Sequence, residues 1–344
     1  MKDAVKSIPH WPAALLLAFL FLAGCSQQKD EIIVSTAGMT MGTTYSVKWV
    51  DSDESRVTDI HTQVETALQA VNQSMSTYID DSELSMFNQM PAQSTIKASD
   101  GLFYVLSLAQ AISETSNGAF DVTVGPLVNL WGFGPDGRVV KAPAQQEIDD
   151  LRNRVGYQTI EINNASQQIT KHSDTYVDLS AIAKGYGVDA VADLLEQQGI
   201  KRYLVEIGGE LRAAGLKPNQ ETWRIAIESP ASAERSVQRI VHVSDTGIAT
   251  SGDYRNYFEE NGIRYSHTID PATGKPISHK LASVTVLRPT CAEADALATA
   301  FTVMGAKKAM AYAKAQKIDA FFIVKSENGF KEMMTPGFES RLVK

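Results

Sequence analysis

The spacing of apolar residues along the chain predicts helices and strands in mixed order. Apolar positions recur every three to four residues in several long stretches, the period of a helix with one buried face. Shorter runs of β-branched and aromatic residues, separated by Gly, Pro or Asn, are typical of strands. The predicted helices cover 59–75, 102–116, 144–153, 188–199, 292–304 and 307–316. The predicted strands cover 43–50, 159–162, 168–171, 176–179, 203–207, 211–214, 224–228, 240–244, 283–287, 319–324 and 331–334. Residues 126–137 are rich in Gly and aromatics and predict an irregular loop.

These elements do not alternate strictly. The pattern therefore favours the α+β class, with mixed sheets and packed helices, over a doubly wound α/β sheet.

The N-terminus has the pattern of an export signal. Lys2 and Lys6 give it a basic start, and residues 13–22 form an apolar run that is too short for a membrane span. The run leads into Leu-Ala-Gly-Cys at residues 22–25, which looks like the lipobox of bacterial lipoproteins. We therefore expect a signal peptide at 1–24, lipid on Cys25, a tether over 25–38 and a domain over 39–344. An uncleaved anchor with an incidental cysteine is the alternative, and the domain is either one large unit or two interleaved lobes.

Composition narrows the function. The 344 residues carry a formal net charge of −8, which argues against nucleic-acid binding and against adhesion to anionic lipid through a basic face. Cys25 and Cys291 are the two cysteines of the sequence. With lipid on Cys25, Cys291 has no partner, so no disulfide framework is expected.

A carboxylate and a hydroxyl share a predicted helix face near the C-terminus. Asp295 and Thr299 are four residues apart and flanked by alanines. Both supply hard oxygen ligands of the kind that Mg²⁺ or Ca²⁺ prefers. The alternative is a solvated aspartate beside a threonine bonded to its own helix.

Residues 178–189 predict an anion site. Asp178 ends a predicted strand, a turn of small residues follows, and a helix begins near Lys184. A helix start offers free N–H groups to phosphate, and Lys184 adds a cation.

The same stretch offers a competing interpretation. Gly185, Gly187 and Ala190 match the dinucleotide fingerprint, and Glu206 follows at the distance of a ribose-binding acid. In that fingerprint the first glycine directly follows the strand, whereas here residues 180–184 intervene. The pattern therefore disfavours a nicotinamide-binding Rossmann unit.

Two further stretches could complete a site. His267 lies in a strand-like run before an Asp-Pro turn and could act as a general base, or be a structural histidine. Residues 249–254 cluster small and polar side chains, as a binding loop would. Other stretches could hold a flat ring such as a flavin, or pack in the core: methionines beside a glycine at 39–43, an aromatic at the end of a predicted helix at 76–78, and glycines with aromatics at 118–125 and 131–133.

Together these motifs resemble the ApbE family, the FAD:protein FMN transferases of bacterial envelopes. The resemblance runs from about residue 39 to the C-terminus and is most specific at 41–43, 118–121, 178–185, 267–274 and 294–300. It implies an ApbE-like, T-fold-related architecture. Ser180 and Ala181 stand where the family usually has glycine.

The resemblance also implies site residues. The metal positions fall on the Ala181 backbone oxygen, Asp295 and Thr299, and His267 falls on the histidine proposed to assist transfer, with Asp295 as an alternative base. The FAD-contact positions fall on Met41, Tyr78, Ala119, Phe120, Asp121, Asp178, Lys184 and Ile269.

By the same resemblance, the expected reaction is Mg²⁺-dependent transfer of the FMN half of FAD to a Thr or Ser hydroxyl of a target protein, with release of AMP. The expected targets are subunits of the sodium-pumping NADH:quinone reductase and of Rnf-type complexes. Those targets favour a lipid-anchored enzyme on the periplasmic side of the inner membrane. The alternatives are a flavin-binding or electron-carrying lipoprotein without transferase activity, and a structural lipoprotein whose motifs are packing.

Overall fold

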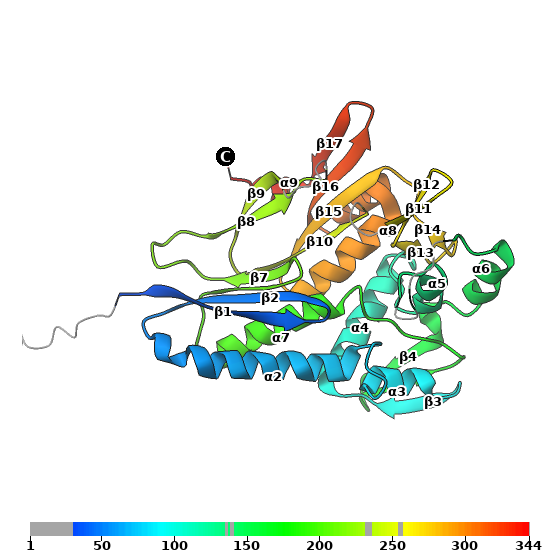
Figure 1. Ribbon diagram of the computed structural model, residues 1–344, viewed down its shortest axis with the longest axis horizontal. Helices are drawn as coiled ribbons and strands as arrows, with labels where there is room; N and C mark the ends of the chain where they lie inside the picture. Colours follow the sequence, from blue (N-terminus) through cyan, green and yellow to red (C-terminus); the bar gives the residue numbers. More distant parts are fainter. Residues whose placement is uncertain (1–29, 135–136, 138–140, 231–235, 254–256, 344) are drawn as a thin grey trace, which may run out of the picture.

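The computed structural model describes residues 30–134, 137, 141–230, 236–253 and 257–343 (Figure 1). The predicted signal peptide, Cys25 and the start of the predicted tether lie outside these residues. None of the helices in the described ranges combines the length and apolarity that a bilayer-spanning helix needs.

The central element is an eight-stranded sheet in the order β1-β2-β6-β7-β10-β15-β16-β17. Each pairing between neighbouring strands of this sheet is antiparallel. Its strands are β1 (Ile32–Thr40), β2 (Thr43–Asp51), β6 (Tyr203–Ile207), β7 (Glu210–Ala214), β10 (Thr246–Gly252), β15 (Leu281–Arg288), β16 (Asp319–Ser326) and β17 (Gly329–Met334).

Within the described residues, four smaller sheets accompany it. One has three strands in the order β3-β5-β4, and the others are two-stranded. Their strands are β3 (Ser94–Lys97), β4 (Ile160–Asn163), β5 (Gln168–Lys171), β8 (Trp223–Glu228), β9 (Val237–Val243), β11 (Tyr257–Glu260), β12 (Ile263–Ser266), β13 (Ile269–Asp270) and β14 (Lys275–Pro276).

Helices cover one side of the central sheet. α7 packs on β6 and β7, α8 packs on β10 and β15, and α2 packs against α7 and β1 (Figure 1). The helices are α2 (Val57–Met75), α3 (Glu83–Gln89), α4 (Asp100–Thr115), α5 (Gly125–Leu130), α6 (Gln145–Arg152), α7 (Ala183–Gln197), α8 (Cys291–Ala315) and α9 (Pro336–Glu339), with 3-10 turns η1 (Glu54–Arg56) and η2 (Tyr157–Thr159).

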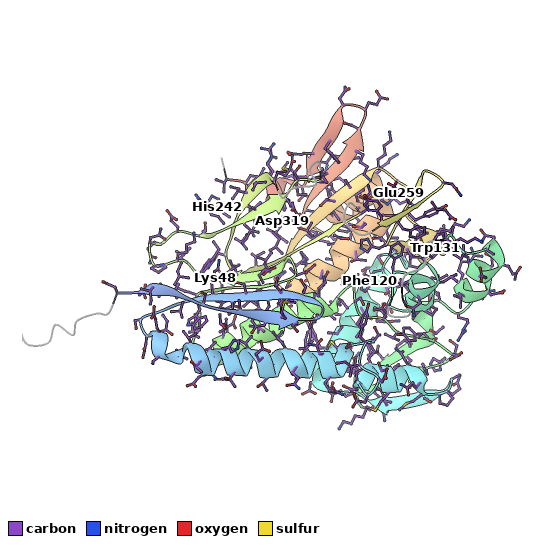
Figure 2. The ribbon with its side chains drawn as sticks, viewed as in Figure 1. Lys48, Phe120, Trp131, His242, Glu259 and Asp319 are labelled. Carbon is purple, nitrogen blue, oxygen red and sulfur yellow. The ribbon has the colours of Figure 1, made fainter. Side chains whose placement is uncertain are left out.

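Burial explains why these segments are helical. The buried side chains of α2 are Ile60, Val64, Leu68, Val71 and Met75, one stripe at helical spacing. The largest core cluster joins α4 and α8 to the strands β15 and β16 and includes the loop that carries Phe120. Figure 2 shows Phe120 near α4, with Trp131 farther toward α6.

α7 and α8 touch backbone to backbone at Gly185. A Cβ at this position would lie 2.5 Å from the Cys291 carbonyl oxygen and 2.8 Å from Asp295 Cβ. Asp189, one turn further along α7, accepts hydrogen bonds from the backbone N–H groups of Cys291 (2.9 Å) and Ala292 (2.8 Å) at the start of α8. These N–H groups have no partner within their own helix. Asp189 therefore stabilises the N-terminal end of α8 and fixes the two helices together.

α8 is interrupted at Gly305, whose φ of 74° lies in the left-handed region. His279 packs beside this glycine and donates from Nε2 to the Thr302 carbonyl oxygen at 2.7 Å. The break agrees with the prediction of separate helices over 292–304 and 307–316.

The fold corrects several predicted elements. Residues 176–179 belong to no strand, because the Asn88 amide pairs with both the N–H and the carbonyl of Val177 (both 2.8 Å). The predicted loop at 126–137 contains α5, and the predicted binding loop at 249–254 is largely β10. β1 begins at Ile32, so the last part of the predicted tether is a strand of the central sheet.

The alternative of a nicotinamide-binding Rossmann unit is wrong. Gly185 and Gly187 lie inside α7 and not in a turn after a strand. β6, which carries Glu206, pairs antiparallel with β2 and β7, whereas the fingerprint requires a parallel βαβ unit. The Glu206 carboxylate accepts from the Gly209 N–H at 2.8 Å.

The α7–α8 contact predicts unequal effects of adding a methyl group at two glycines of one helix. Gly185→Ala should lower the free energy of unfolding by about 1–3 kcal/mol, because its Cβ meets backbone that cannot move away. Gly187→Ala is the matched control, because its Cβ meets the flexible end of Met41 and the tip of Ile207. Its free energy of unfolding should stay within about 1 kcal/mol of the parent, because alanine favours helix. Urea unfolding measures both, and equal losses would contradict the proposed tight contact.

Candidate functional site

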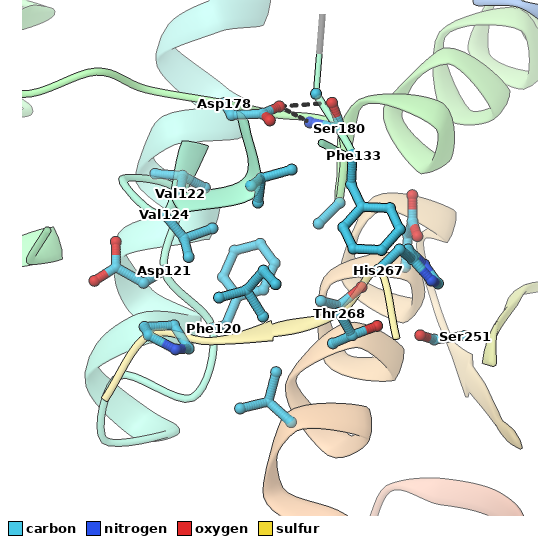
Figure 3. Close-up of a pocket in the computed structure, with 18 of the residues that line it drawn as sticks. Phe120, Asp121, Val122, Val124, Phe133, Asp178, Ser180, Ser251, His267 and Thr268 are labelled. Atoms are coloured by element: carbon cyan, nitrogen blue, oxygen red, sulfur yellow. Dashed lines mark hydrogen bonds between the residues drawn. The ribbon is translucent and has the colours of Figure 1, made fainter. Parts of the chain in front are cut away.

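A cavity of about 440 Å³ opens beside the N-terminal ends of α7 and α8. Its walls come from segments far apart in the sequence: the loop before α5, the segment before α7, the strands β7 and β10, the segment from β12 to β13, and α8 (Figure 3). It is lined by Tyr78, Ala119, Phe120, Asp121, Val122, Val124, Val128, Phe133, Gly134, Asp178, Ser180, Ala181, Lys184, Glu210, Thr250, Ser251, Gly252, His267, Thr268, Ile269, Pro271, Asp295, Thr299 and Val303.

The predicted oxygen ligands meet on this surface. Asp295 and Thr299 project from one face of α8, and Ala181 faces the same cavity from the turn before α7. Asp295 is only 6% exposed, and its Oδ2 accepts from the Gly185 N–H at 3.0 Å. The alternative of a solvated aspartate is therefore wrong.

A partly exposed ammonium lies beside a buried carboxylate in the same cavity. Lys184 Nζ lies 2.8 Å from Glu210 Oε1, and the Glu210 side chain is almost fully buried. The second carboxylate oxygen of Glu210, Oε2, is buried and has no hydrogen-bond partner within the described part of the chain. We call Lys184, Glu210 and Asp295 the charged cluster.

Burial governs the charge states of the charged cluster. Burial raises the pKa of Glu210 to about 7; Lys184 opposes this rise and Asp295 adds to it. Burial also raises the pKa of Asp295, against the opposing effects of Lys184 and the Gly185 N–H. Burial alone would lower the pKa of Lys184, but the carboxylates of Asp295 and Glu210 outweigh it and raise that pKa. Two carboxylates facing one ammonium leave an excess of negative charge that a bound cation would relieve.

The donor set fits a small divalent cation. It offers one carboxylate, one hydroxyl and one backbone carbonyl, and the ranges that the structure covers hold no group of three or more His, Cys, Asp or Glu side chains placed to bind a metal. Mg²⁺ commonly takes one or two carboxylates and completes its shell with water and substrate phosphates.

Two further aspartates shape the walls of the cavity. Asp178 Oδ1 accepts from the Ser180 N–H (2.8 Å) and hydroxyl (2.6 Å), the dashed lines in Figure 3. Asp121 accepts from the Thr123 N–H (2.8 Å) and hydroxyl (2.6 Å) and from the Tyr157 N–H (2.9 Å). Burial raises the pKa of Asp121, and these donors oppose the rise. Asp121 therefore fixes the loop that carries Phe120.

Apolar and aromatic side chains form another part of the cavity wall. Phe120 and Ile269 are almost fully buried, and Phe133 meets the His267 ring edge-on with centroids 6.3 Å apart. His267 follows β12, and in Figure 3 it lies near Phe133 and Thr268. This wall could accept a flat ring, while the charged cluster faces the same space.

The cavity gathers nearly all of the site residues that the motifs predicted. They are Tyr78, Ala119, Phe120, Asp121, Asp178, Ala181, Lys184, His267, Ile269, Asp295 and Thr299. Met41 is not among the lining residues; it forms the turn between β1 and β2, and its side chain packs over Gly187.

Glu210 was not predicted. It follows two glycines with positive φ, Gly208 and Gly209, which form the tight turn into β7. That pair of glycines before an acid is a sequence signal for a turn, but only the fold shows that the acid meets Lys184.

A model of the ApbE family matches residues 41–322. The chain belongs to the ApbE family. A protein from Vibrio cholerae named FAD:protein FMN transferase is 47% identical over 340 residues, which is 97% of this chain and 99% of that protein. A protein of the same name from Escherichia coli is 40% identical over 96% of this chain and 97% of its own length.

Solved structures of ApbE proteins share the fold of this chain. The flavin transferase ApbE from Vibrio cholerae is 45% identical and superposes with a TM-score of 0.83, covering 91% of this chain and all of that one. The Pseudomonas stutzeri flavinyl transferase ApbE in its apo form is 42% identical with a TM-score of 0.83, covering 90% of this chain and 97% of that one. The predicted family and the predicted α+β, ApbE-like fold are confirmed.

The hydrogen bonds that Asp121 accepts predict an effect on the stability of the fold. Asp121→Asn should lower the free energy of unfolding by about 1–3 kcal/mol, because the new amide group can no longer accept from both the Thr123 and Tyr157 donors. Asp149→Asn on the exposed face of α6 is the control and should change it by less than about 0.5 kcal/mol. Chemical denaturation distinguishes them, and a neutral Asp121→Asn would show that these hydrogen bonds do not hold the loop.

Proposed function

We propose that this chain is an FAD:protein FMN transferase that depends on a divalent cation, preferentially Mg²⁺. The observation that carries the proposal is one cavity that joins the charged cluster and Thr299 to an apolar wall. The full-length relatives that carry the name FAD:protein FMN transferase support the same activity, as the sequence motifs predicted.

The cation would be held by the Asp295 carboxylate, the Thr299 hydroxyl and the Ala181 carbonyl oxygen. Support comes from the hard oxygen character of this set and from the excess of carboxylates around Lys184. The chemistry that Mg²⁺ supplies when bound is neutralisation of diphosphate charge and polarisation of the phosphorus on the FMN side.

The chain's own residues would position FAD. Lys184, in the first turn of α7, presents its ammonium to the diphosphate. The N–H groups of Ile182, Ala183 and Gly185 at this helix start already have partners within the protein, so the lysine side chain supplies the positive charge. Phe120, Phe133 and Ile269 offer an apolar wall for the flavin ring, and the Asp178 turn closes one side. Holding the reactants in place accounts for much of catalysis in phosphoryl transfer.

The transfer step then needs a nucleophile and a base. The oxygen of a Thr or Ser hydroxyl on the target protein forms a bond to the FMN phosphorus, and the bond from that phosphorus to the bridging oxygen breaks. AMP departs with that oxygen, and the hydroxyl proton passes to a ring nitrogen of His267. Asp295 is the alternative proton acceptor, because it lines the same cavity.

The sequence supports a location for this reaction. Leu22-Ala23-Gly24-Cys25 after the apolar run supports cleavage before Cys25 and attachment of lipid to its thiol. We place the enzyme on the periplasmic side of the inner membrane, where subunits of the sodium-pumping NADH:quinone reductase and Rnf-type complexes would serve as targets.

The function is tested with purified protein, FAD, Mg²⁺ and a candidate target subunit. The expected result is release of AMP together with a gain of one FMN in the mass of the target. FAD binding without AMP release under any divalent cation would favour the alternative, a flavin-binding or electron-carrying lipoprotein.

The cation site predicts the effect of removing one ligand. Asp295→Asn should lower the metal-dependent rate on the order of a hundredfold or more, since the cation contributes several kcal/mol to transition-state stabilisation. Asp193→Asn, on the exposed side of α7, is the control and should keep the parent rate. AMP release over a Mg²⁺ titration measures both, and an unchanged rate for Asp295→Asn would remove the metal assignment.

The assignment of His267 as the base predicts a second kinetic effect. His267→Ala should slow transfer by about 10²–10⁴-fold near neutral pH, the usual contribution of general acid–base catalysis, with FAD affinity largely retained. Rates from AMP release and affinities from FAD fluorescence separate these effects. A normal rate near pH 7 would exclude His267 as the base.

A further inference from the structure

Glu210 is a buried carboxylate to which the proposed reaction assigns no role. It begins β7, is 5% exposed and lines the cavity beside Asp295. Its Oε1 lies 2.8 Å from Lys184 Nζ, while its Oε2 is buried without a partner in the described part of the chain.

Two buried carboxylates lie near the Lys184 ammonium. The next residue, Gly185, donates its N–H to Asp295 at 3.0 Å, so Asp295 lies against the same turn of α7 that carries the lysine. Among the described residues, the ammonium forms its ion pair with Glu210 and not with Asp295. An ammonium on Asp295 would cancel the charge that a divalent cation needs there.

We propose that Glu210 is a positioning residue that holds the Lys184 ammonium away from Asp295. Asp295 then stays available to the divalent cation, and the ammonium stays directed into the cavity, toward the diphosphate. This inference rests on the proposed function, because it assumes that Asp295 binds the cation. A purely structural pair is a weaker explanation, because buried ion pairs often contribute little net stability.

The inference predicts a cation-binding defect that a second substitution repairs. In Glu210→Gln, the ammonium loses its partner and moves to Asp295, so Mn²⁺ affinity should fall by about 10–100-fold, the usual effect of losing an outer-sphere partner. In the double variant Glu210→Gln/Lys184→Met, no ammonium remains to occupy Asp295. Its Mn²⁺ affinity should return to within about threefold of the parent, a strong departure from additivity.

The experiment uses the full chain without FAD or target protein. The concentration of free Mn²⁺ is measured by electron paramagnetic resonance. Asp295→Asn defines the binding that belongs to this site, and Glu332→Gln, which breaks the surface ion pair with Arg239, is the matched control. Thermal unfolding shows which variants fold. If Glu210→Gln does not fold, Glu210→Asp replaces it, because it keeps the charge but shortens its reach; its defect should be smaller and equally repaired by Lys184→Met.

Three results would overturn the inference. Parent-like Mn²⁺ affinity in Glu210→Gln would show that Glu210 does not protect Asp295. A double variant as weak as Glu210→Gln would show that Glu210 acts directly on the cation or on the fold. In both cases the proposed function stands. Absence of Asp295-dependent Mn²⁺ binding in the parent would overturn the cation site and this inference together.

Discussion

The site depends on the close contact between α7 and α8 at Gly185. Because this residue has no side chain, the backbone of α8 can approach until Asp295 accepts the Gly185 N–H at 3.0 Å. Asp189 then fixes the start of α8 through the Cys291 and Ala292 N–H groups. One helix brings Lys184, the other brings Asp295 and Thr299, and neither could form the cavity alone.

The cavity combines two environments that flavin dinucleotides need. On one side, the carboxylates of Glu210 and Asp295 are buried where water screens little, so their interactions with the partly exposed Lys184 ammonium are strengthened. On the other side, Phe120 and Ile269 offer a dry apolar surface. Polar groups in turn fix the loops that carry the wall residues. Asp121, next to Phe120, accepts three hydrogen bonds that shape the loop. Rigid walls of this kind would hold a substrate without further rearrangement.

Local pattern predicted much of this molecule, and the failures have physical causes. Helices such as α2 were predicted because one face is apolar at a regular spacing. Residues 176–179 alternate like a strand because Val177 and Leu179 are buried while the residues before each of them are partly exposed, but the Asn88 side chain takes the place of a neighbouring strand. β1 was missed because its exposed positions hide its alternation. The motifs located most of the lining residues, but Glu210 reaches Lys184 only through the β6–β7 turn and the pairing of these strands, which no local pattern contains.

The proposed reaction requires one arrangement: a divalent cation between the α8 oxygens and the diphosphate of a flavin dinucleotide. Crystals of the full chain soaked with FAD and Mn²⁺ test it most directly, because manganese is located by its anomalous scattering. The predicted result is one manganese in contact with Asp295, Thr299, the Ala181 carbonyl and the FAD diphosphate, with the flavin ring against Phe120. A manganese elsewhere, or a flavin bound outside this cavity, would contradict it.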